Sequence, residues 1–72
     1  MRKFYVIITD DKFGVFDENK YKYTSFFRDN ISQAEVVDEC DLYEYLVKIL
    51  GRNILVKYGF DMVYSIGRVF SL

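Results

Sequence analysis

The segment 41–50 constrains the fold more than any other part of the sequence, because it carries a complete amphipathic helix pattern. Its apolar residues recur at steps of three and four and so share one face of a helix; they are Leu42, Tyr45, Leu46, Ile49 and Leu50. Asp41 stands at the N-cap position and Glu44 follows three residues later, which predicts a capping box. Gly51 comes directly after the pattern, where a left-handed C-cap residue is favourable. We therefore expect one main helix over residues 41–50, with its apolar face packed on a β-sheet.

The residues before this helix predict strands. Lys3–Thr9 is β-branched and aromatic and is apolar on both faces, so we expect a central strand. Residues 10–12 have turn chemistry, and Phe13–Phe16 has the composition of the returning strand of a hairpin. Gly14 inside that strand indicates a bulge or a close approach of the backbone. Gln33–Asp38 predicts a further strand, which leads into the helix.

The segment 21–27 fits two kinds of structure. Its alternating tyrosine, serine and phenylalanine residues favour a strand. Thr24–Asn30 also fits a short helix, with Thr24 or Ser25 as its N-cap. We favour the strand and keep the helix as the alternative.

Two more strands are expected after the helix. A strand over Asn53–Tyr58 places Ile54, Val56 and Tyr58 on one face, against Leu55 and Lys57. A longer strand over Met62–Phe70 places Met62, Tyr64, Ile66 and Phe70 on one face, with Gly67 marking a bulge. Residues 1–72 are too few for more than one small domain. The predicted class is therefore α+β, with a mostly antiparallel sheet of about four to six strands and the main helix on one face.

The absence of histidine and the single cysteine exclude much of catalytic chemistry. A chain without histidine has no Ser-His or Cys-His nucleophilic pair and no histidine metal ligand. Cys40 lies beside Asp38, Glu39 and Asp41, which disfavour a reactive thiolate. We therefore expect a protein that is not an enzyme and that holds no cofactor.

Acidic residues of the first hairpin have the chemistry of a site for Ca²⁺ or Mg²⁺ if they meet at one end: Asp10, Asp11, Asp17 and Glu18. Their spacing is not that of an EF-hand loop, and aspartate is also a common turn residue. We therefore favour turn chemistry and expect no metal site.

Acidic residues also gather around the start of the main helix, at Glu35, Asp38, Glu39, Asp41 and Glu44. Acids suit the positive end of a helix dipole, which is a sufficient structural reason for them. They also form a patch suited to a basic protein surface. Tyr58, Tyr64 and Arg68 belong to residue types that are enriched at interface centres, so we predict that they share in protein binding.

The residues Lys20, Tyr21, Lys22 and Tyr23 interleave bases with aromatics, which is typical of strands that stack single-stranded nucleic acid. Neighbouring acids and the net charge of −1 weigh against this alternative, because nucleic-acid domains usually carry a basic excess.

The composition is similar to that of short accessory proteins of phages and mobile elements, which often act by binding a host enzyme; this similarity transfers no residue roles. The sequence has no apolar run of about 18 residues and no signal segment, so we expect a cytoplasmic protein without a membrane span. We predict a protein-binding module, such as an inhibitor that covers the basic surface of a nucleic-acid enzyme. The alternatives are a single-strand-binding module and a small homo-oligomer paired through its C-terminal edge strand.

Overall fold

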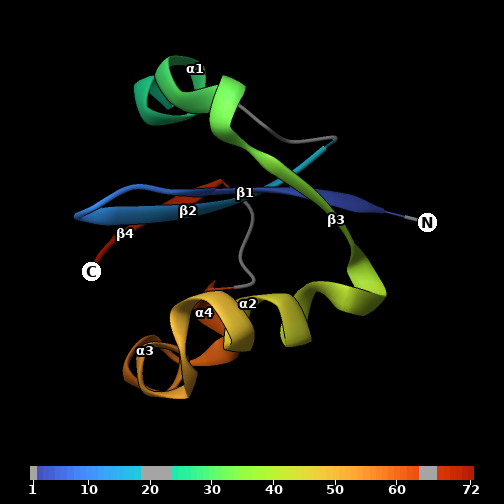
Figure 1. Ribbon diagram of the computed structural model, residues 1–72, viewed down its shortest axis with the longest axis vertical. Helices are drawn as coiled ribbons and strands as arrows, with labels where there is room; N and C mark the ends of the chain where they lie inside the picture. The colour runs from blue at the N-terminus through green and yellow to red at the C-terminus, as the bar shows by residue number, and fades with distance from the viewer. Residues whose placement is uncertain (1, 19–23, 64–66) are drawn as a thin grey trace.

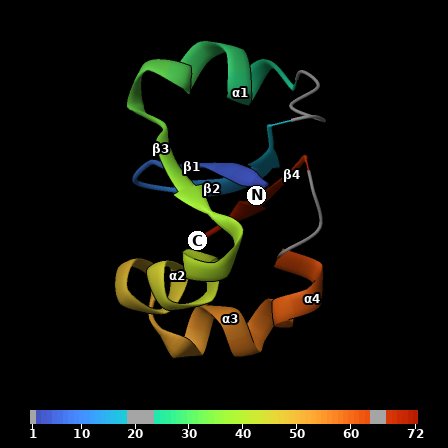
Figure 2. The ribbon, with the colours of Figure 1, turned by 90° about the vertical axis from the view of Figure 1, so that its right-hand side faces the viewer.

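In the computed structural model a four-stranded antiparallel sheet lies between two helical layers (Figure 1). The structure describes residues 2–18, 24–63 and 67–72. The strand order is β3-β1-β2-β4. α1 lies on one face of the sheet, and α2, α3 and α4 lie on the other (Figure 2). The elements in chain order are β1 (Lys3–Ile8), β2 (Lys12–Asp17), α1 (Ser25–Asn30), η1 (Ile31–Gln33), β3 (Glu35–Asp38), η2 (Glu39–Asp41), α2 (Leu42–Leu50), α3 (Arg52–Tyr58), α4 (Phe60–Val63) and β4 (Arg68–Ser71). The predicted α+β class is confirmed.

β1 and β2 form the predicted hairpin. Thr9 closes it, because its backbone N–H donates to the carbonyl oxygen of Lys12 at 2.8 Å. β1 pairs with β2 on one side and with β3 on the other, so its central position is confirmed. Its apolar residues therefore face a helical layer on either side, which explains why both faces of this strand lack charge.

Gly14 marks a close approach and not a bulge. It stays in register with Ile7 of β1 and with Val69 of β4. A Cβ atom at this position would lie 2.6 Å from the ring of Phe16 and 3.2 Å from that of Phe26. The missing side chain thus leaves the room in which Phe16 packs beneath α1.

The main core lies between the sheet and α2, where Leu42 and Leu46 are fully buried as predicted. Ile49 differs from the prediction, since 47% of it is exposed. The predicted capping box is wrong, because Asp41 ends η2 in a helical conformation and its side chain makes no cap hydrogen bond. Gly51 has the expected positive φ of 86°, although its ψ of 153° is extended.

The strand favoured for residues 21–27 is wrong over its described part, and the alternative helix is correct. Thr24 caps α1, because its hydroxyl oxygen accepts a hydrogen bond from the Phe27 N–H at 3.1 Å. Phe27 then packs edge-on against Phe16 at 5.0 Å between ring centroids. Residues 21–23 of that prediction lie outside the described residues.

The strand predicted over Asn53–Tyr58 is wrong, because these residues belong to α3. Leu55 is buried there, and Ile54 and Tyr58 pack beside it, which is a helical spacing. The alternating pattern also puts Val56 at an inward position, whereas 74% of Val56 is exposed.

The prediction of a last strand over Met62–Phe70 is also wrong in its first part, because Met62 lies in α4 and β4 begins only at Arg68. Gly67 behaves as predicted. Its N–H donates to the carbonyl oxygen of Val15 at 3.0 Å, while Arg68 is the registered partner of Val15. Gly67 and Arg68 thus both lie opposite Val15, as in a β-bulge. The φ of 80° at Gly67 suits the bulge position.

Candidate protein-binding surface

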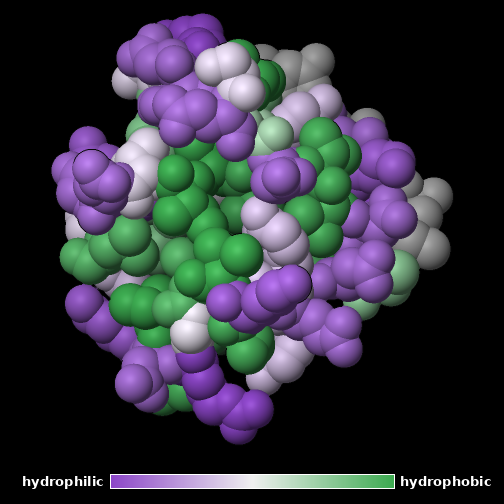
Figure 3. Space-filling view, viewed as in Figure 1, coloured by the Kyte–Doolittle hydropathy of each residue, from purple (hydrophilic) through white to green (hydrophobic). Residues whose placement is uncertain are grey.

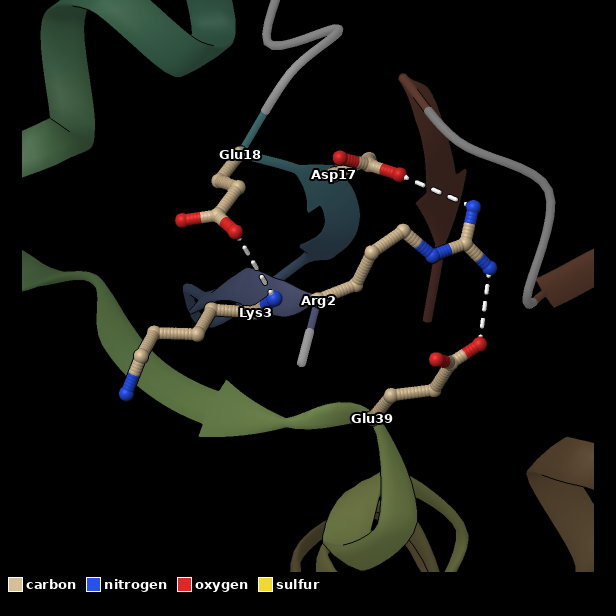
Figure 4. Close-up of polar contacts among 5 residues, drawn as sticks. All are labelled: Arg2, Lys3, Asp17, Glu18 and Glu39. Atoms are coloured by element: carbon tan, nitrogen blue, oxygen red, sulfur yellow. Dashed lines mark hydrogen bonds and ion pairs between the residues drawn. The ribbon is translucent and has the colours of Figure 1, made fainter.

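The acidic residues predicted to bind protein lie where β3 passes through η2 into α2. Two of them are engaged within the fold. The Lys3 ammonium lies 3.1 Å from a carboxylate oxygen of Asp38. A guanidinium nitrogen of Arg2 donates to Glu39 at 2.8 Å, as Figure 4 shows. These two acids therefore fasten the N-terminal residues to the β3–η2 junction.

Arg2 also reaches the one described charged side chain that is buried. Its second guanidinium nitrogen donates to Asp17 at 3.2 Å, and Asp17 is 1% exposed (Figure 4). A buried carboxylate is costly unless it is paired, and Arg2 supplies the pairing. At the same end of the sheet Glu18 accepts a hydrogen bond from the backbone N–H of Lys3 at 3.3 Å. Polar contacts thus hold the ends of β1, β2 and β3 together.

The remaining three acids, Glu35, Asp41 and Glu44, are exposed to solvent. Burial raises the pKa of the Tyr45 hydroxyl above its ordinary value, and the negative charge of Glu35 raises it further. Glu35 therefore lies beside the flank of α2 that carries Tyr45. Asp41 and Glu44 stand at the start of the same helix, so the three carboxylates follow the chain from β3 onto α2. Glu44 is directed away from the sheet, because it lies two residues from the buried Leu42 and Leu46.

β3, η1 and α2 also carry exposed apolar side chains. Val36 on β3 is 51% exposed, Ile31 on η1 is 44% exposed, and Ile49 on α2 is 47% exposed. Ile49 comes one turn after Tyr45, so it shares the flank that faces Glu35. Figure 3 shows apolar surface gathered between α1 and α2 on the face where β3 forms the near edge of the sheet. We call this region the β3–α2 surface and define it by Glu35, Val36, Asp41, Glu44 and Ile49.

The sequence did not single out Val36 and Ile49 as surface residues. Periodicity places Ile49 on the apolar face of the main helix, and Val36 lies within the predicted strand Gln33–Asp38. The available signal was the short strand of β3 with an acid at each end, Glu35 and Asp38, because charged residues are typical of exposed sheet edges.

The aromatic and basic residues predicted to share in binding lie elsewhere. Tyr58 is engaged internally: its hydroxyl donates to the carbonyl oxygen of Ser71, and its ring packs against Phe70 at 5.1 Å. Arg68 is exposed on β4, at the opposite edge of the sheet from β3. Tyr64 lies outside the described residues, as do Lys20, Tyr21, Lys22 and Tyr23. The predicted interface residues therefore do not form one surface.

The hairpin acids do not meet. Asp10 and Asp11 lie in the turn that joins β1 to β2, whereas Asp17 and Glu18 lie at the far end of β2. Strands of this length separate the two pairs by about 15 Å or more. Within residues 2–18, 24–63 and 67–72 no group of three or more acidic or cysteine side chains is arranged to hold a metal ion.

The described residues also contain no pocket, and none of their helices is long and apolar enough to cross a membrane. The chemistry of the β3–α2 surface therefore lies in its exposed carboxylates and exposed apolar side chains. Comparison of the chain with protein-family models, with curated proteins and with solved structures found no match.

Proposed function

We propose that this chain is a non-enzymatic protein-binding module that uses the β3–α2 surface to contact a basic region of another protein. The observation that supports it is the exposure of carboxylates and of apolar side chains on β3 and α2, two elements that contact one another. Glu35, Asp41 and Glu44 supply negative charge, and Val36 and Ile49 supply apolar area. Apolar centres within polar rims are typical of protein interfaces, and the charges steer the encounter with an oppositely charged partner.

The partner class follows from the charge. A basic surface that normally attracts phosphate groups is the natural complement of these exposed carboxylates, so a nucleic-acid enzyme of a host is the partner that we propose. Covering that surface would inhibit the enzyme without any chemistry on the part of this protein.

Charge reversal tests the proposal. The variant Glu35→Lys/Asp41→Lys/Glu44→Lys changes the three exposed carboxylates while leaving the ion pairs of Arg2 and Lys3 intact. The matched control, Asp10→Lys/Asp11→Lys/Asp29→Lys, changes the net charge equally at exposed positions away from this surface.

The measurement is capture of partners from the lysate of the source organism by each immobilised protein, at low and at high salt, with quantification by mass spectrometry. We expect the wild type and the control to enrich the same basic protein at low salt, and the β3–α2 variant to lose it. Equal capture by all three proteins would refute the role of this surface.

A second candidate function is self-association through β4, which is favoured by its position at the edge of the sheet. Arg68 is the charged residue of β4, so little charge protects that edge from pairing. Sedimentation at several concentrations tests it, since a mass that rises with concentration and falls in Val69→Pro would support pairing through β4. Single-strand binding through Lys20 to Tyr23 stays a prediction.

A further inference from the structure

The outer edge of β3 presents unpaired backbone groups at a defined position. The N–H of Glu39 donates to the carbonyl oxygen of Arg2 at 2.9 Å, which identifies these two residues as a hydrogen-bonded pair of the ladder. Antiparallel pairs alternate between hydrogen-bonded and non-hydrogen-bonded. The registered pairs of Val37 with Phe4 and of Glu35 with Val6 are then also hydrogen-bonded. The N–H and C=O groups of the residue between them, Val36, therefore point away from β1.

Successive side chains along this edge face opposite sides of the sheet. Val37 packs in the core beneath α2, so Glu35, two residues earlier, faces the α2 side of the sheet. Val36 faces the α1 side, where Ala34 packs and where Ile31 of η1 is also exposed. An added strand would thus meet Val36 and the ion-paired Asp38 on the α1 face and the Glu35 carboxylate on the α2 face.

We propose that an extended segment of the partner pairs with the outer edge of β3, with an apolar side chain beside Val36 and Lys or Arg side chains on either side of it. The residue opposite Val36 lies on the α1 face, where burial is apolar. Its two neighbours lie on the α2 face, where Glu35 is the exposed carboxylate of β3. This inference rests on the proposed function and specifies its mode as strand addition to a sheet edge.

Charge complementarity favours a basic segment of the partner over a second copy of β3 as the strand that pairs with this edge. Two copies of β3 paired antiparallel about Val36 bring their Glu35 carboxylates onto the same face as diagonal neighbours, which is repulsive. Acids on a short edge strand are a recognised protection against self-pairing. A basic segment removes that repulsion and uses the same backbone groups.

The probe is a blocked, fluorescein-labelled peptide of sequence Thr-Lys-Val-Lys-Val-Lys-Thr, whose binding is measured by fluorescence anisotropy at low salt. Val36→Pro removes the outward N–H without removing a bond to β1, and proline is tolerated at such edge positions. Val36→Thr is the matched control, because it keeps the N–H and the branched shape. We expect the control to bind within about threefold of the wild type and Val36→Pro to bind at least about tenfold more weakly. A peptide with Glu in place of Lys is expected to show no binding up to about 1 mM.

A second measurement keeps the test valid if Val36→Pro does not fold, as judged by circular dichroism. In a second peptide of the same sequence, the backbone nitrogen of the valine that pairs with Val36 is methylated, which removes its N–H donor. We expect this methylated peptide to bind the wild type at least about tenfold more weakly than the unmethylated peptide. Equal affinity of the two peptides, or absence of any binding up to about 1 mM, would overturn strand addition. A wild-type mass above that of the monomer, lost in Val36→Pro, would assign the edge to a second copy and would also overturn it.

The two proposals fail separately. Loss of the captured partner in the three-acid variant but not in Val36→Pro refutes strand addition and leaves the protein-binding surface in place. Retention of the partner in the three-acid variant refutes the surface itself.

Discussion

The clearest structural constraint on this fold is the absence of a side chain at Gly14, and Gly14→Ala tests it. The added Cβ would lie 2.6 Å from Cε2 and 2.7 Å from Cζ of Phe16, both well inside van der Waals contact. Phe16 is fully buried and its ring packs against Phe27 of α1. The ring has to move, and α1 has to move with it.

The expected cost follows from two opposing effects. Overpacking of a well-packed core costs about 1–3 kcal/mol. Replacing a glycine in a strand interior returns about 0.5–1 kcal/mol through lower chain entropy. The difference between the two effects is about 0–2.5 kcal/mol. Because the two shortest contacts of the added Cβ are below 3.0 Å, we expect the upper part of this range, so that Gly14→Ala lowers the free energy of unfolding by about 1–2.5 kcal/mol, out of a total of about 4–11 kcal/mol for a chain of this length. The midpoint of thermal unfolding should fall by about 4–8 °C per kcal/mol.

Urea unfolding followed by circular dichroism gives the free energy, and amide hydrogen exchange shows where the strain acts. Exchange should accelerate in α1 and stay unchanged in α2. The double variant Gly14→Ala/Phe16→Leu removes the two ring atoms in conflict and should cost less than the sum of its single variants. A Gly14→Ala protein as stable as the wild type, with unchanged exchange in α1, would refute the reasoning.

Three further predictions concern the main core, the buried carboxylate and the acidic surface. Leu46→Ala should lower the free energy of unfolding in urea by about 2–5 kcal/mol, whereas Ile49→Ala, on the same helix, should lower it by less than about 1 kcal/mol. Similar losses for the two variants would contradict the assigned buried face of the helix. Asp17→Ala should cost about 1–3 kcal/mol through the lost charged hydrogen bond, and a neutral result would show that its guanidinium partner contributes nothing. Glu35→Gln should lower the Tyr45 pKa only in part, as measured by ultraviolet titration, because burial is the larger cause. Since the folded pKa exceeds the unfolded value of 10.0, the contribution of Tyr45 to stability is complete below that pH and is lost as pH rises above it; Tyr45→Phe should reduce that loss.

The predictable parts of the fold are those where two signals agree. The hairpin combines apolar strands with turn residues, and α2 combines an amphipathic period with a terminal glycine. α3 was missed because its apolar residues fit two periods: Ile54 and Tyr58 alternate as in a strand, yet they also lie one helical turn apart. Only tertiary packing decides between them: in the helix Leu55 is buried in the main core, and Ile54 and Tyr58 pack against that core.

The candidate site was predictable only in its acids. Glu35, Asp41 and Glu44 are apparent in the sequence, but the engagement of Asp38 by Lys3 depends on a contact between distant segments. The exposure of Val36 likewise depends on the strand order, because the same residue would be buried if β3 were an inner strand.

Hydrogen exchange of this protein, free and bound to its captured partner, tests the central claim that the β3–α2 surface binds another protein. We predict that slowing of exchange on binding is concentrated in residues 34–49, with little change in α1 and β4. Protection confined to α1 or β4, with residues 34–49 exchanging as in the free protein, would contradict the account.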